Sequence, residues 1–137
     1  MTRRVCAAGI AAVGLTSVAA LAAAAAPSPT LVTLSPQRGH VAVVARFGPD
    51  QSPYEVEVAR APRVAGAGFP RSSLVAREYL PVARDGVVRY RTHARLGAGV
   101  YWAAVSARLL DATSCLPVRR GVDCNVEWSR PRELRVR

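Results

Sequence analysis

Apolar and polar residues alternate along several short stretches of this chain. A period of two is typical of a β-strand that buries one face, because successive side chains point to opposite sides of a sheet. The inward residues that this pattern predicts are Val41, Val43, Ala45 and Phe47; Tyr54, Val56 and Val58; Val88, Tyr90 and Thr92; Tyr101, Ala103, Val105, Ala107 and Leu109; and Leu134 and Val136.

Turn-forming residues separate these runs, at 48–50, 66–68, 85–86 and 97–99. Two further runs complete the set, "LVTL" from Leu31 and the less regular "SLVAREYL" from Ser73. No stretch has the period of an amphipathic helix. The pattern therefore predicts an all-β fold, a single antiparallel β-sandwich of seven strands.

The polar positions of these runs are expected to face water. Glu55 and Glu57 share one strand face, and we expect them to be solvated and to face arginines across the sheet. Arg89 and Arg91 occupy the outward positions of a later run, and Arg108, Arg135 and Arg137 also fall on outward positions. Outward arginines next to inward valines predict a charged surface over an apolar core.

Residues 1–26 do not fit the strand pattern. Arg3 and Arg4 precede a charge-free, alanine-rich run that ends before Pro27, which is the order of a secretory signal peptide. An uncleaved membrane anchor is the alternative, because the run is about as long as the ~20 residues of a membrane span. The two arginines leave Sec and twin-arginine export both open. We therefore expect a signal peptide at 1–26 and one folded domain at 27–137.

The charge of the chain changes what the surface is expected to do. All 19 basic residues are arginine, against 9 acidic residues, and the formal net charge is +10. Removal of Arg3 and Arg4 leaves 17 arginines and 9 acids, a net charge of +8. Such a charge favours contact with anionic surfaces, although it also serves solubility alone.

Cys115 and Cys124 remain once the signal peptide, with its Cys6, is removed. An even number of cysteines in an exported chain predicts a disulfide, expected to stabilise the fold by about 2.5–3 kcal/mol. Two thiols without a nearby histidine cannot complete a zinc site, and no metal is expected. The bridge would close a long loop that carries Arg119 and Arg120, either to display them for binding or only to stabilise the loop.

The segment "LGAGVYWAAVSAR", residues 96–108, resembles the sixth strand of fibronectin type III domains. "YEVEV" is similar to the third strand of that family and "EWSRPRELRV" to its last, while the tryptophan common in its second strand is absent. The resemblance implies an immunoglobulin-like sandwich with Tyr101 as the buried tyrosine of a tyrosine corner, whose hydroxyl returns to upstream backbone. An ordinary strand aromatic is the other interpretation of Tyr101. Matching positions are Leu96, Gly99, Tyr101, Trp102, Val105 and Ala107.

No sequence motif for catalysis, phosphate binding or dinucleotide binding occurs in the chain. We therefore expect a non-enzymatic binding module without a cofactor, either secreted or located in the periplasm or cell envelope. Its expected partner is a protein or an anionic cell-envelope polymer, and a membrane only if residues 1–26 stay uncleaved. Nucleic acid is not expected, since export separates the two and basic residues do not interleave with aromatic ones. We expect a monomer.

The alanine-rich run that ends before Pro27 generates the first prediction. Intact mass of the protein recovered from its native host should place the N-terminus within a few residues of Pro27. Recovery of the full-length chain in a membrane fraction that needs detergent would instead establish the anchored form.

Overall fold

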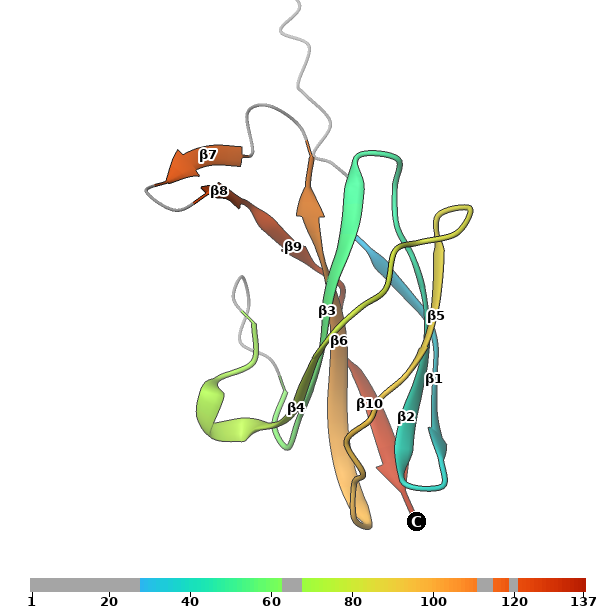
Figure 1. The fold of residues 1–137 in the computed structure, drawn as a ribbon. Coiled ribbons are helices and arrows are strands. Elements are labelled where there is room, and N and C mark those ends of the chain that lie inside the picture. The colour runs from blue at the N-terminus through green and yellow to red at the C-terminus, as the bar shows by residue number, and fades with distance from the viewer. Residues whose placement is uncertain (1–27, 63–67, 111–114, 119–120) are drawn as a thin grey trace, which may run out of the picture.

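The computed structural model describes residues 28–62, 68–110, 115–118 and 121–137. These residues form an all-β fold with two antiparallel sheets packed face to face, compatible with a β-sandwich (Figure 1). The smaller sheet has the strand order β1-β2-β5, and the larger has β10-β6-β3-β4 with β9 also paired to β6. A separate hairpin, β7-β8, extends from the larger sheet (Figure 1).

The strands of each sheet have the following bounds. The smaller sheet comprises β1 (Thr30–Gln37), β2 (His40–Arg46) and β5 (Val87–Arg91). The larger comprises β3 (Gln51–Ala59), β4 (Leu74–Tyr79), β6 (Gly99–Leu109), β9 (Val126–Trp128) and β10 (Arg132–Val136). The hairpin comprises β7 (Cys115–Val118) and β8 (Gly121–Cys124), and a 3₁₀ turn, η1 (Arg71–Ser73), precedes β4.

The strand count differs from the seven expected, because the described residues form ten strand segments. The stretch expected to be a loop contains β7, β8 and β9. In addition, the last strand is divided at 129–131, so that β9 and β10 pair with different parts of β6. Pro131 cannot donate a backbone hydrogen bond to a ladder, which accounts for the break.

One apolar core fills the space between the sheets, and the alternation in the sequence identified most of it. Val41, Val43 and Val88 contribute from the smaller sheet, and Val56 and Val58 from the larger. β6 is buried on both faces in its middle, because Ala104 and Ser106 on its outer side are as inaccessible as Val105. The remaining core members include Leu31, Ala45, Phe47, Tyr101, Ala103, Ala107, Leu134 and Val136.

Two tight turns reverse the chain, one between the paired strands β1 and β2 and one between the bridge partners Arg84 and Val87. Arg38 and Gly39 between β1 and β2, and Asp85 and Gly86 before β5, all have positive φ. Two consecutive positive φ values define the two-residue hairpin turn whose twist matches the flanking strands. Gly86 has a second constraint, since a Cβ there would lie 3.0 Å from the backbone oxygen of Phe47. The turn predicted at 85–86 is confirmed.

The outer face of the larger sheet is partly covered by the segment that leads into β4. Phe69 packs on Ala59 and Ala104, and two tryptophans, Trp102 and Trp128, pack against this second cluster. This cover explains why the middle of β6 is buried on both sides. The smaller sheet has its outer face directed away from the rest of the described chain (Figure 1).

Tyr101 lies near the start of β6, and its side chain is 1% exposed. Its hydroxyl donates a 3.0 Å hydrogen bond to the carbonyl oxygen of Gly97, four residues upstream. The guanidinium carbon of Arg60 lies 5.6 Å from the centre of the ring. The hydrogen bond therefore fixes the turn at 97–99 against the strand that follows it.

Tyr101→Phe should lower the free energy of unfolding by about 1 kcal/mol, because the ring remains packed while one buried hydrogen bond is lost. Urea denaturation of both proteins measures this difference. Tyr79→Phe is the matched control, because Tyr79 is 70% exposed and its loss should cost less than about 0.5 kcal/mol. Equal midpoints for the two variants would contradict a stabilising role for the Gly97 contact.

Candidate binding surface

The outer face of the smaller sheet carries arginines and no acidic side chain. Arg46 on β2 and Arg89 and Arg91 on β5 are exposed, and they are register partners of Val87, Val44 and Ala42 respectively. None of β1, β2 and β5 contains an aspartate or a glutamate. We call the outward positions of these three strands the basic face; they comprise Thr30, Thr33, Ser35, Gln37, His40, Ala42, Val44, Arg46, Val87, Arg89 and Arg91.

Open hollows lie at the ends of the basic face. Gln37, Arg38 and Arg91 line one of them, beside the turn between β1 and β2. The other lies beside the turn before β5, where Arg84 and Arg89 meet the acidic residue Asp85. The arginine density therefore continues from the strands into the neighbouring turns.

The expectation that Glu55 and Glu57 are solvated was wrong. They are 3% and 4% exposed, on the covered outer face of the larger sheet. Arg77 on β4 donates to both oxygens of Glu55, at 2.8 Å from Nε and 3.2 Å from Nη2, and its Nε lies 3.8 Å from Glu57. The backbone N–H of Phe69 donates to Glu57 over 2.8 Å. These carboxylates thus hold the covering segment on the sheet.

The Glu55 contact also changes the arginine, whose side chain is half exposed. The hydrogen bond to Glu55, followed by the charge of that carboxylate, raises the pKa of Arg77 above its ordinary value. The expected arginine across the sheet is therefore present, but it pairs with a buried carboxylate while its own side chain is half exposed.

Tyr54 was expected in the core and lies outside it. The pairing of β3 with β6 shifts between Pro53 and Val56, so that two residues of β3 stand opposite one residue of β6. Such a bulge turns the extra residue away from its regular face. The guanidinium carbon of Arg108 lies over the Tyr54 ring, 4.1 Å from the ring centre. The ring centres of Tyr54 and Tyr79 are 5.6 Å apart.

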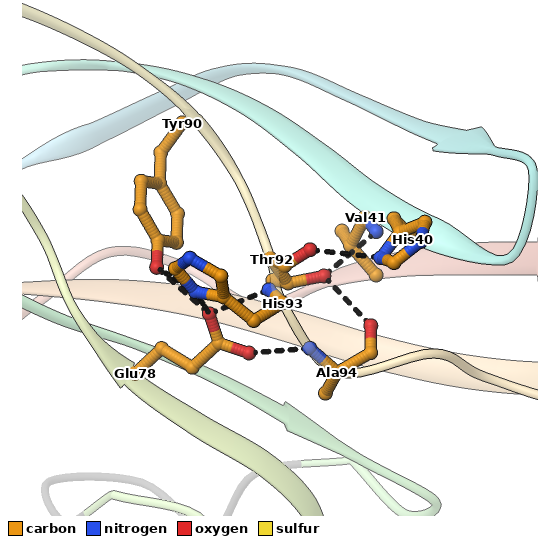
Figure 2. A network of polar contacts seen from close by, with 7 residues as sticks. All are labelled: His40, Val41, Glu78, Tyr90, Thr92, His93 and Ala94. Carbon is orange, nitrogen blue, oxygen red and sulfur yellow. Dashed lines mark hydrogen bonds and ion pairs between the residues drawn. The ribbon is translucent and has the colours of Figure 1, made fainter.

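Glu78 on β4 reaches across to the end of β5, where it joins the two sheets (Figure 2). Its Oε2 accepts hydrogen bonds of 2.8 Å from the Tyr90 hydroxyl and from the His93 backbone N–H. Its Oε1 accepts one of 2.8 Å from the backbone N–H of Ala94. Nδ1 of His93 lies 3.1 Å from Oε2 and 3.1 Å from the Tyr90 hydroxyl. We call these four residues, Glu78, Tyr90, His93 and Ala94, the Glu78 network.

The protonation of the Glu78 network follows from these contacts. Burial opposes the charge on Glu78, but the backbone hydrogen bonds of Ala94 and His93 and those of two side chains outweigh it, so the pKa of Glu78 is lowered. Burial, then the hydrogen bond to Glu78 and its charge, raise the pKa of Tyr90 to about 12. At neutral pH the network therefore holds an ionised carboxylate and a neutral phenol.

Neighbouring polar contacts continue the Glu78 network into the basic face (Figure 2). The Thr92 hydroxyl accepts from the backbone N–H of Val41 over 2.9 Å and donates to the Ala94 carbonyl oxygen over 3.2 Å. Nδ1 of His40 donates to the Thr92 carbonyl oxygen over 2.9 Å. The end of β5 is thereby fixed both to β2 and to β4.

The opposite edges of the two sheets are joined by an arginine. Nη1 of Arg132 on β10 donates to the carbonyl oxygens of Leu31 and Val32 on β1, over 3.2 and 2.8 Å. The irregular register of β1 between Leu31 and Thr33 falls at this point. The sandwich thus has a polar tie at each lateral edge.

The His93 side chain is 87% exposed, although it belongs to the Glu78 network rather than standing alone. Among the residues that the structure describes, no group of three or more histidine, cysteine, aspartate and glutamate side chains is placed to hold a metal ion.

Cys115 and Cys124 are register partners at the open end of the β7-β8 hairpin. Opposite residues of antiparallel strands have Cα atoms about 4.5–5.5 Å apart, within the range that a disulfide spans. The disulfide stays a prediction, since only the backbone is described here. Arg119 and Arg120 of the expected binding loop, and the segment 1–26, lie outside the described residues.

Comparison with known proteins gives no relative to guide the interpretation. No family model matches the chain, and no curated protein matches it. Within the described ranges, no helix is long and apolar enough to cross a membrane. The interpretation of this surface therefore depends on its own chemistry.

Glu78→Gln should destabilise the domain at neutral pH by about 1–3 kcal/mol, because charge-assisted hydrogen bonds are replaced by weaker ones. The lowered pKa means that ionised Glu78 contributes its full stability above the pKa of the unfolded chain, and loses it as the pH falls through the folded pKa. The variant should therefore lose less stability than the wild type on acidification. Denaturant unfolding from about pH 7 to about pH 3 measures both effects.

Glu133→Gln is the matched control. Glu133 pairs with Arg135 over 3.0 Å, and both side chains are well exposed. Exposed pairs contribute about 0–1 kcal/mol. Parallel pH profiles of the Glu78 variant and the wild type would show that the Glu78 network does not stabilise the fold.

Proposed function

We propose that this protein is an exported, non-enzymatic binding domain that contacts anionic cell-envelope material through the basic face. The observation that carries the proposal is the separation of charge. Arg46, Arg89 and Arg91 share an uncovered sheet face whose strands contain no acidic residue. A surface of one sign attracts polyanions and accelerates their association.

The domain is proposed to be a sandwich of the fibronectin type III kind. The first, second and fifth strands form one sheet, and the third, sixth and last form the other, which is how immunoglobulin-like sandwiches divide their strands. The fourth strand, β4, joins the third rather than the fifth. The Tyr101 hydroxyl bond to upstream backbone supports a tyrosine corner.

A binding role is preferred to catalysis because three glutamates of the larger sheet already have structural partners. Glu55 is engaged by Arg77, and Glu57 accepts the Phe69 backbone N–H. Glu78 is saturated by the ends of β5. A general acid or base needs access to a substrate. Glu55 and Glu57 are buried, and both oxygens of the partly exposed Glu78 already accept hydrogen bonds.

An accessory domain held at the envelope by an uncleaved segment 1–26 is the second candidate. The apolar run from Val5 to Ala26 is the feature that favours it. In that case salt would not release the protein, because an inserted helix is held by burial rather than by charge. The two candidates thus differ in one measurement.

Mature protein should bind isolated envelope material at low salt and be released as salt rises to the physiological level, where the Debye length is about 8 Å. Arg89→Glu with Arg91→Glu should abolish retention, because the reversal changes the charge of the basic face by four units. Co-sedimentation at a series of salt concentrations measures both.

Two further double variants with the same change of charge test whether retention depends on the basic face or on another surface. Arg130→Glu with Arg135→Glu alters exposed residues in and beside β10 and should leave retention close to wild type. Arg119→Glu with Arg120→Glu tests the loop as the contact site. Retention that is unaffected by salt, or equally reduced by all three pairs, would refute a role for the basic face.

A further inference from the structure

The basic face consists of two chemically different rows of side chains, one of arginines and one of neutral hydrogen-bonding groups. A surface that attracts anions by charge alone would need only the arginines. Arg89 and Arg91 form a row along β5, which Arg46 of β2 extends. Neutral hydrogen-bonding side chains form the other row, along β1, at Thr30, Thr33, Ser35 and Gln37. All of these side chains are exposed.

The register places the two rows opposite each other. Thr33 pairs with Val44, which pairs with Arg89. Two residues further along, Ser35 pairs with Ala42, which pairs with Arg91. The same order of a hydroxyl, a small apolar side chain and a guanidinium therefore occurs twice, about 7 Å apart along the strands and about 10 Å wide.

A third cross-section completes the pattern in part. Thr30 pairs with Arg46 and Arg46 with Val87, so here the guanidinium stands on the central strand. The face thus offers three guanidinium groups and three hydroxyls over a length of about 14 Å. Such a repeat matches a linear ligand whose units each carry an acidic group and hydroxyl groups.

We propose that the basic face binds a linear acidic polysaccharide that lies along β1, β2 and β5. The guanidinium groups of Arg89 and Arg91 bind its carboxylate or sulfate groups, since their fork geometry matches two oxygens of one anion. Thr33 and Ser35 exchange hydrogen bonds with its hydroxyls, as both donor and acceptor. Ala42 and Val44 leave room between the rows for the sugar rings. This inference depends on the proposed function.

Other polyanions fit the face less well. A membrane surface would need large apolar side chains to insert. The apolar outward positions are Ala42, Val44 and Val87, all partly buried, and Val32 at the irregular register of β1 is 39% exposed. A single-stranded nucleic acid would need aromatic rings on which bases stack, and the outward strand positions supply none apart from the half-buried His40 imidazole. An inorganic polyphosphate would use the arginines, but its chain carries no hydroxyl groups, so the hydroxyl row could only donate to its oxygens and not accept from it.

The test uses mature protein and four probes in binding titrations at fixed salt. The probes are oligomers of galacturonate, neutral dextran, inorganic polyphosphate, and vesicles that contain phosphatidylglycerol. Galacturonate oligomers should bind more tightly than the other three. Thr33→Val with Ser35→Ala keeps side-chain size and charge, and it should weaken galacturonate binding about fivefold to tenfold for two lost hydrogen bonds. Polyphosphate binding should change less than about twofold, because its charge contacts remain.

Charge reversal distinguishes failure of this inference from failure of the proposed function. Arg89→Glu with Arg91→Glu should abolish binding of all anionic probes, whereas Arg130→Glu with Arg135→Glu should not. If the hydroxyl variant binds galacturonate as wild type does, or if polyphosphate or vesicles bind more tightly, the polysaccharide inference is overturned and the anion-binding role stands. If neither arginine pair affects any probe, both proposals fail. Thermal melts of each variant confirm that it is folded.

Discussion

The Glu78 carboxylate joins two sheets that share no backbone hydrogen bonds across their interface. Interdigitated apolar side chains hold the two sheets of a sandwich face to face, and directed polar bonds add a further constraint on how one sheet lies laterally against the other. Glu78 supplies that constraint at one edge with directed bonds to Tyr90, His93 and Ala94, and Arg132 supplies it at the other. The ladder with β2 places β5 in its own sheet, and the Glu78 bonds fix the end of β5 relative to the larger sheet.

Where burial has a period of two, the sequence alone predicted the fold well. The alternation correctly identified the inward residues Val41, Val43 and Ala45 on β2 and Tyr101, Ala103, Val105 and Ala107 on β6. The pattern failed at β3, because a bulge moves Tyr54 off the core face. It also failed for Glu55 and Glu57, since a segment more than ten residues away covers them. A local pattern contains no information on such long-range cover.

The sequence alone predicted only part of the candidate surface. Arg89 and Arg91 were identified as outward, but their pairing with Val44 and Ala42, and the row formed by Thr33 and Ser35, depends on strand register. The Glu78 network was not expected either, because its members come from strands of different sheets. A net charge likewise does not say how charges are distributed. Here the acids of the described strands lie in the larger sheet or the hairpin, where three of the glutamates are occupied in holding the fold.

The arginines of β5 also affect what happens at the edge of the smaller sheet. β5 is an outermost strand, so part of its backbone is available for pairing with another chain. If two copies met edge to edge in an antiparallel arrangement, their strands would be about 4.8 Å apart and four guanidinium groups would crowd one face. Their mutual repulsion opposes such contact, and arginine keeps its charge at every physiological pH. The residues proposed to attract a polymer therefore also protect the exposed strand from self-association and from growth into fibrils.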